Sequence, residues 1–225
     1  MFTKNISFLN FKKKGHFKSI NKKLKYVLYN KKEVINSLSE NYKNSFEPEK
    51  LKKKYNNSNF RVIGMGGSIL GTQAIYDFLK KKIKKKFIFI DNLEASRKKP
   101  DHKHYTNLIV SKSGNTIETI ANSNILIKKK DKNIFITENK KNYLKILAQK
   151  LKSEIIHHND YIGGRYSVLS EVGMLPAELM GLNIKNFKQL NNIIKNKNFI
   201  NSLIVNVEAT LNFIKNKKYN SIIIN

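Results

Sequence analysis

The chain has 225 residues, of which 40% are hydrophobic, and its 44 Lys and Arg against 16 Asp and Glu give a formal net charge of +28. This length and hydrophobic content suffice for one sizeable core, or for one domain and part of another. The sequence has no cysteine. It also lacks an apolar run near the roughly 18 residues of a membrane span, so secreted, disulfide-stapled and membrane-spanning classes are not expected.

Lysine dominates the positive charge, because arginine occurs at Arg61, Arg97 and Arg165 alone, and the chain also contains 31 asparagines and 29 isoleucines. Lys, Asn and Ile have the most A/T-rich codons, so a biased genome would produce this mixture without selection on function. Nucleic-acid-binding proteins usually add arginine, whose planar fork contacts guanine and phosphate in a bidentate manner. We therefore expect no specific nucleic-acid partner and, without a convincing targeting signal, a cytoplasmic location.

The predicted elements begin with a helical lead-in over residues 1–58, where apolar residues recur at loose helical spacing. From Phe60, short apolar strands alternate with helices. Strands are predicted at 60–64, 87–90, 107–110, 133–137 and 153–156, and helices at about 71–85, 116–129 and 141–152. Strands that are apolar throughout and separated by helices are typical of a parallel sheet covered on both faces. The fold class is therefore α/β, with a doubly wound parallel sheet.

After Gly181 the sequence predicts two more helices, at about 186–196 and 199–217, and then a β-branched run at 222–224. A strand at this position could be an edge strand. Alternatively, the sequence is cut inside a second α/β domain, of which residues 183–225 would be the opening part.

A first glycine cluster, Gly64-Met-Gly-Gly-Ser-Ile-Leu-Gly71, follows the first predicted strand. At the carboxyl end of a parallel strand, glycines let the backbone approach an anion. The cluster lacks the Gly-Lys-Ser/Thr ending of a P-loop, and Ile69 breaks the dinucleotide-binding spacing. A plain structural turn remains an open alternative.

A second cluster, Ser111-Lys-Ser-Gly-Asn-Thr-Ile-Glu-Thr119, directly follows the predicted strand at 107–110. Its four hydroxyls, one lysine and one glycine stand where a helix is expected to begin, and free N–H groups and the helix dipole favour a phosphate there. The alternative is an elaborate N-cap built from Asn115 or Thr116, with Glu118 in the first turn. One cap explains a single hydroxyl, so we favour binding of a monophosphate.

The third cluster is Gly163-Gly-Arg-Tyr-Ser-Val-Leu-Ser170. An arginine in so lysine-rich a chain indicates a need for a planar group that is always charged. Pairing of Arg165 with a structural carboxylate is the alternative.

These three clusters, in this order and spacing, resemble the glucose-6-phosphate isomerase family, and the middle one also resembles sugar-isomerase (SIS) domains more widely. The resemblance is close over about 60–182. It implies a three-layer SIS sugar-phosphate domain at 59–182, preceded by a helical segment at 1–58 and followed at 183–225 by the start of an incomplete second SIS domain. The implied activity is the isomerisation of glucose 6-phosphate to fructose 6-phosphate in glycolysis and gluconeogenesis.

The resemblance also implies roles for individual residues. Arg165 would face the developing enediolate, with Gly164 beside it, and Glu118 would lie near the catalytic histidine of the complete enzyme. The remaining residues would bind the substrate or its phosphate: Gly67, Ser68, Ser111, Lys112, Ser113, Gly114, Asn115, Thr116 and Thr119. The family more often has threonine and an aromatic residue where this chain has Ser113 and Gly114.

In the family, the glutamate base, a histidine and a further lysine come from later parts of the chain, whereas all five histidines here precede Gly163. His157 and His158 would point to opposite faces of a strand, so we expect no metal site, and the reaction needs no cofactor. The sequence therefore resembles the N-terminal half of an isomerase, expected to be inactive alone and to form a homodimer when complete. The alternative is a non-catalytic SIS module that binds a sugar phosphate.

Overall fold

The computed structural model describes residues 18–30, 32, 34–93 and 105–216, which form two compact units. The larger unit is Tyr42–Phe187, and the smaller one combines the described parts of Met1–Asn41 and Lys188–Asn225. The β-branched run at 222–224 and three of the histidines (16, 102 and 104) lie outside the described residues.

The larger unit is built on a five-stranded sheet in which every pairing is parallel and the strand order is β2-β1-β3-β4-β5. The strands are β1 (Asn59–Ile63), β2 (Phe87–Ile90), β3 (Tyr105–Val110), β4 (Asn133–Glu138) and β5 (Glu154–His158). All five overlap the strands predicted from sequence. The α/β doubly wound class is therefore confirmed.

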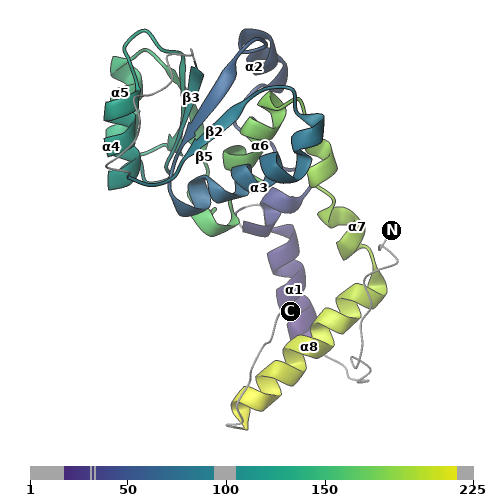
Figure 1. Ribbon diagram of the computed structural model, residues 1–225. Coiled ribbons are helices and arrows are strands. Elements are labelled where there is room, and N and C mark those ends of the chain that lie inside the picture. Colours follow the sequence, from purple (N-terminus) through teal and green to yellow (C-terminus); the bar gives the residue numbers. More distant parts are fainter. Residues whose placement is uncertain (1–17, 31, 33, 94–104, 217–225) are drawn as a thin grey trace. The chain divides into compact units, whose positions relative to one another are not determined.

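Helices cover both faces of this sheet, which gives three layers (Figure 1). They are α2 (Pro48–Lys54), α3 (Leu70–Leu79), α4 (Ile117–Leu126), α5 (Tyr143–Lys150) and α6 (Glu171–Leu179). Short 3₁₀ turns complete the unit: η2 (Gly66–Ser68), η3 (Lys80–Lys82), η4 (Gly164–Tyr166) and η5 (Ile184–Phe187).

Alternating strand residues divide the core between the two faces. Ile134 and Ile136 of β4 pack in the cluster that includes α2, α3 and α6, whereas Phe135 packs in the cluster that includes α4 and α5. This alternation follows from the two-residue period of a strand. Both faces are apolar because both are covered.

Part of the lead-in belongs to this core. Tyr42, Phe46, Leu51 and Tyr55 are all less than 9% exposed, and the last three pack in the cluster that includes α6. The compact α/β unit consequently begins at Tyr42, whereas sequence patterns suggested a boundary near residue 58.

The smaller unit contains α1 (Lys18–Tyr29), η1 (Val34–Leu38), α7 (Leu190–Ile194) and α8 (Lys197–Lys215). Helix α1 contacts α8, and the Asn191 amide donates a hydrogen bond of 2.5 Å to Glu40. Among the helices that the structure describes, none combines the length and apolar content needed to cross a membrane.

Candidate active site

The three sequence clusters follow β1, β3 and β5, at the carboxyl edge of the sheet. In the order β2-β1-β3-β4-β5, the chain leaves β1 toward one edge and β3 toward the other, so the two strands flank the topological switch point. Open α/β sheets bind ligands in the crevice at this point. The Gly64–Gly71 and Ser111–Thr119 segments are therefore side by side where a ligand is expected.

The first and third clusters touch through their backbones. A Cβ added to Gly67 would lie 2.3 Å from the carbonyl oxygen of Gly164, which leaves space for glycine alone. The Ser167 hydroxyl contacts both loops, at 2.7 Å from the Gly164 oxygen and 3.3 Å from the Gly67 oxygen. This contact places the half-buried Ser68 close to the turn that contains Arg165.

The second cluster forms a turn before α4. Thr116 occupies the N-cap position, yet its side chain makes no capping hydrogen bond. Its Oγ1 instead lies 2.9 Å from Oγ of Ser111, which also accepts from the Gly114 N–H at 3.2 Å. Ser113 Oγ accepts from the Asn115 N–H at 3.3 Å. The capping interpretation thus identifies the N-cap residue but not what the hydroxyls do.

Burial separates the residues of this turn. Ser111 is 2% exposed and braces the loop from inside, whereas Ser113 and Asn115 are exposed and Thr116 and Glu118 are half-buried. Ser111 therefore fixes a loop in which Ser113 and Asn115 face outward.

Thr119 occupies a different environment. It is 1% exposed, and its Oγ1 has no hydrogen-bond partner among the described residues. A buried hydroxyl without a protein partner costs free energy unless a water or another polar group bonds to it.

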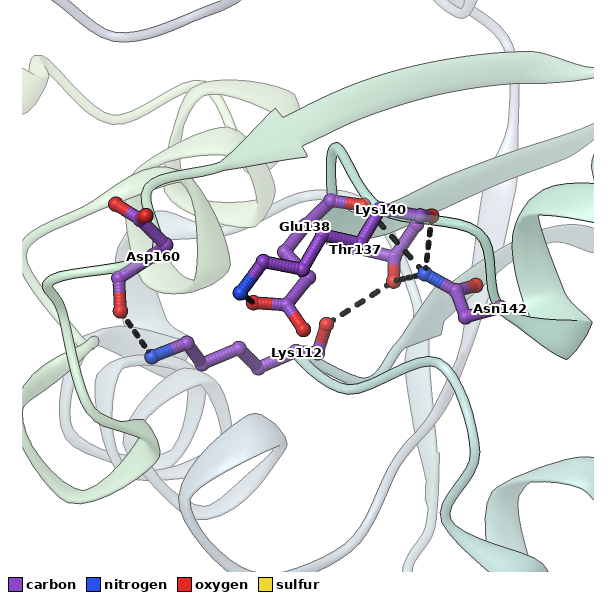
Figure 2. Close-up of polar contacts among 6 residues, drawn as sticks. All are labelled: Lys112, Thr137, Glu138, Lys140, Asn142 and Asp160. Carbon is purple, nitrogen blue, oxygen red and sulfur yellow. Dashed lines mark hydrogen bonds and ion pairs between the residues drawn. The ribbon is translucent and has the colours of Figure 1, made fainter.

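The loop is fastened to the neighbouring β4–α5 connection, as Figure 2 shows. The Lys112 carbonyl accepts from the Thr137 hydroxyl at 3.1 Å and from the Glu138 N–H at 3.0 Å. Asn142, the N-cap of α5, donates to Thr137 Oγ1 at 3.2 Å, and its Oδ1 accepts from the Lys145 N–H at 2.8 Å.

Helix α5 also supplies two of its free N–H groups to the loop. Leu144 donates to the Gly114 carbonyl at 3.1 Å, and Tyr143 donates to Asn115 Oδ1 at 3.0 Å. Gly114 has φ +65°, and a Cβ there would lie 2.0 Å from Oδ1 of Asn142. Sequence reasoning missed Thr137 and Asn142, because nothing in their local sequence marks a distant loop as their partner.

The Lys112 side chain joins the second cluster to the third. Its ammonium donates to the backbone carbonyl of Asp160, in the connection between β5 and Gly163 (Figure 2). Burial, together with the nearby Lys112 charge, lowers the pKa of His158 to about 4. His158 is 3% exposed while His157 is exposed, so the two rings face opposite sides of β5 as predicted.

Arg165 lies in η4 with its side chain exposed. Within the described part of the chain, no carboxylate forms an ion pair with its guanidinium, so the structural-carboxylate alternative gains no support there. Gly164 beside it has open space where a Cβ would stand. The arrangement therefore presents an exposed cation, a hydroxyl-rich turn and a lysine around the β1/β3 crevice.

A model of the phosphoglucose isomerase family matches residues 54–221. The chain belongs to this family. Curated relatives include a glucose-6-phosphate isomerase of Methanocaldococcus jannaschii, 37% identical over 60% of this chain and 36% of the relative. Another is that of Acholeplasma laidlawii, 36% identical over 60% of this chain and 37% of the relative. The family resemblance inferred from the three clusters is thus confirmed.

The aligned region spans about a third of the length of these curated relatives. Among solved structures, a hypothetical protein of Thermus thermophilus superposes with a TM-score of 0.62 at 20% identity, covering 88% of this chain and 52% of that one. This likeness concerns the fold alone, and it agrees with the three-layer α/β architecture.

Proposed function

We propose that this chain supplies the phosphate anchor and the oxyanion-facing cation of an isomerase that interconverts glucose 6-phosphate and fructose 6-phosphate. The observation that carries the proposal is the Ser111–Thr116 turn at the start of α4, whose hydroxyls bond to each other instead of capping the helix. The free N–H groups of the first turn are then left for an anion. Because the chain belongs to the phosphoglucose isomerase family, we take this anion to be the phosphate of a sugar phosphate.

In this proposal, Ser113, Thr116 and the N–H groups of the α4 first turn hold the 6-phosphate, and Ser111 and Gly114 keep the turn in shape. Lys112 contributes its positive charge, and Asn115 fixes the turn against α5. Thr119 provides a hydroxyl from below the turn, where it has no other partner among the described residues. A dianionic phosphate bound by several donors and one ammonium gains charge-assisted hydrogen bonds, which are stronger than neutral ones.

The sugar end would lie along the Gly67–Gly164 contact. Aldose–ketose isomerisation moves a proton between C2 and C1 through an enediolate, and the negative charge that develops on oxygen needs a fixed cation. Arg165 is exposed beside this contact and offers a planar guanidinium cation. Gly67, Ser68 and Gly164 would allow the sugar to approach the backbone, and Glu118 would lie near a histidine supplied from elsewhere.

The general base is proposed to come from outside this chain's matched region, since that region corresponds to about a third of the relatives' length. The 225-residue chain should consequently bind sugar 6-phosphate and turn over nothing. A homodimer belongs to the same proposal, and sedimentation of the chain tests it. The isomerisation is a proton transfer without net oxidation, so it requires no redox cofactor.

The test is a calorimetric titration of the chain with fructose 6-phosphate in about 0.2 M chloride, where non-specific attraction to the +28 charge is screened. We expect saturable binding, and the affinity of a Ser111→Ala/Thr116→Ala variant should be at least tenfold lower. A matched Ser202→Ala/Thr210→Ala variant in α8 removes the same two hydroxyls elsewhere and should bind like the parent.

A coupled isomerase assay runs beside the titration. Turnover by the chain alone would contradict the assignment of the base to another part of the protein. Unchanged binding in the Ser111/Thr116 variant would contradict the phosphate site itself. Binding by a complete protein that shows no turnover would favour the non-catalytic module instead.

A further inference from the structure

A fully buried carboxylate directly follows the third cluster and plays no part in the proposed chemistry. Glu171, the first residue of α6, is 0% exposed. The Tyr42 hydroxyl lies 2.9 and 3.0 Å from its two carboxylate oxygens, and the Ser45 N–H donates to Oε1 at 3.1 Å. A buried carboxylate is costly unless such donors surround it, so this arrangement needs a reason.

The donors of Glu171 also hold the end of β5. The Tyr42 hydroxyl accepts a hydrogen bond of 2.7 Å from the Asn159 amide, and the Ser45 hydroxyl donates to the His157 carbonyl. Burial and the adjacent Glu171 charge raise the pKa of Tyr42, which therefore keeps its hydrogen as a donor to the carboxylate. The Tyr42 oxygen is then oriented to accept the hydrogen bond from the Asn159 amide.

Asn159 opens the connection that holds the acceptor of the Lys112 ammonium and leads to Arg165. Its carbonyl accepts from the Ile162 N–H at 3.2 Å, and the next residue, Asp160, provides the carbonyl that receives the Lys112 ammonium. Gly163 to Arg165 follow at once. The position of these cations thus depends on how the 159–163 connection is held.

We propose that Glu171 is a positioning residue, which acts through the Tyr42 hydroxyl and Asn159 to fix the connection bearing the Lys112 acceptor and Arg165. The roles of Lys112 and Arg165 toward a ligand rest on the proposed function. The positioning itself can be measured without any ligand.

A second pair, formed by a buried tyrosine and a half-buried glutamate, provides a matched control. The Tyr55 hydroxyl donates to Glu154 at 3.0 Å, and Tyr55 is 2% exposed, compared with 7% for Tyr42. Tyr55 lies in the same stretch of the chain before β1. Its side chain contacts Glu154 and Lys54 and its backbone bonds to Leu51, Ser58 and Lys85, and all of these residues lie outside the 159–165 connection. Tyr55→Phe therefore removes an equivalent hydroxyl from a different place.

The experiment is amide hydrogen exchange by NMR on the full chain and on Tyr42→Phe, Glu171→Gln and Tyr55→Phe. The reporters are the Ile162, Tyr166 and Ser167 amides, which donate to carbonyls within 159–164, and the reference is the Asn107 amide of β3. Tyr42→Phe should accelerate exchange of the reporters by about tenfold relative to Asn107, as expected for one lost hydrogen bond to a charged network. Glu171→Gln should act in the same direction, since its new NH₂ competes with Asn159 for the Tyr42 oxygen.

Equal acceleration of reporters and reference would mean general destabilisation and would overturn the proposal. So would reporters that do not respond, or the same response in Tyr55→Phe. Titration with fructose 6-phosphate separates the two hypotheses. A chain that does not bind while Tyr42→Phe mobilises the reporters refutes the proposed function and supports positioning, whereas a binding chain with unresponsive reporters refutes positioning alone.

Discussion

Replacing Gly67 by alanine tests the contact between the first and third clusters. The new Cβ would lie 2.3 Å from the Gly164 carbonyl oxygen, 2.4 Å from its carbonyl carbon and 2.9 Å from the Arg165 nitrogen. All three atoms belong to the backbone, so no side-chain rotation relieves the overlap. The two loops must separate instead.

Forced repacking of this kind costs about 1–3 kcal/mol. For a chain of this size, each kcal/mol lowers the melting temperature by about 2–4 °C. We therefore expect Gly67→Ala to melt roughly 2–12 °C below the parent in a thermal scan followed by far-ultraviolet circular dichroism. Fructose 6-phosphate affinity should fall as well, because the Arg165 turn moves away from Ser68.

Gly164→Ala is the control from the other side of the same contact. A Cβ at Gly164 would meet nothing within 4 Å, and its φ is not in the left-handed region. Such a substitution is neutral or stabilises by about 0.4–1 kcal/mol through the unfolded chain. If Gly67→Ala melts as high as Gly164→Ala, the close approach of the two loops is refuted.

Three further predictions concern the second cluster, the buried His158 of β5 and the third cluster. Gly114→Ala places a Cβ 2.0 Å from Asn142 Oδ1 at a residue with φ +65°. It should lower the free energy of unfolding in urea by at least about 2 kcal/mol and abolish phosphate binding. Retained binding would contradict the fastening of the loop to α5. The pKa of His158 is about 4 in the folded state and 6.5 in the unfolded state, so the unfolded state takes up the proton first. The free energy of unfolding should therefore fall by up to about 3 kcal/mol as the pH drops from 6.5 to about 4. His158→Leu should flatten the pH dependence of the urea midpoint between pH 6.5 and about 4, and an unchanged slope would contradict the buried neutral ring. Arg165→Lys should change the affinity for inorganic phosphate by no more than about twofold. It should weaken the binding of a phosphorylated hydroxamate, which mimics the enediolate, by about 100-fold. An equal loss of affinity for both ligands would instead assign Arg165 to the binding of phosphate.

The sheet could be predicted from sequence because its strands are short, apolar and bounded by helices or glycines. Helix α6 could not, because all nine of its residues are buried and it includes Gly173 and Pro176. A helix without a polar face has no 3.6-residue pattern to detect.

The candidate site was predictable to the extent that its residues follow strands. The carboxyl ends of parallel strands share one edge, so clusters after β1, β3 and β5 had to converge. The supporting side chains were not predictable. Thr137 bonds to the Lys112 carbonyl 25 positions away and Tyr42 bonds to Glu171 129 positions away, and the local sequence contains no signal for such distant pairings.

The central claim is that the turn at 111–119 binds the phosphate of a sugar phosphate. Its most direct test is an amide NMR titration of the chain with fructose 6-phosphate in about 0.2 M chloride, with fructose and with sulfate as separate comparisons. We expect saturable shifts that are largest at Ser113–Thr119, with smaller ones at Gly67, Ser68 and Arg165 that fructose 6-phosphate produces and sulfate does not. Shifts spread over the lysine-rich surface, or equal in size for sulfate at every position, would contradict it.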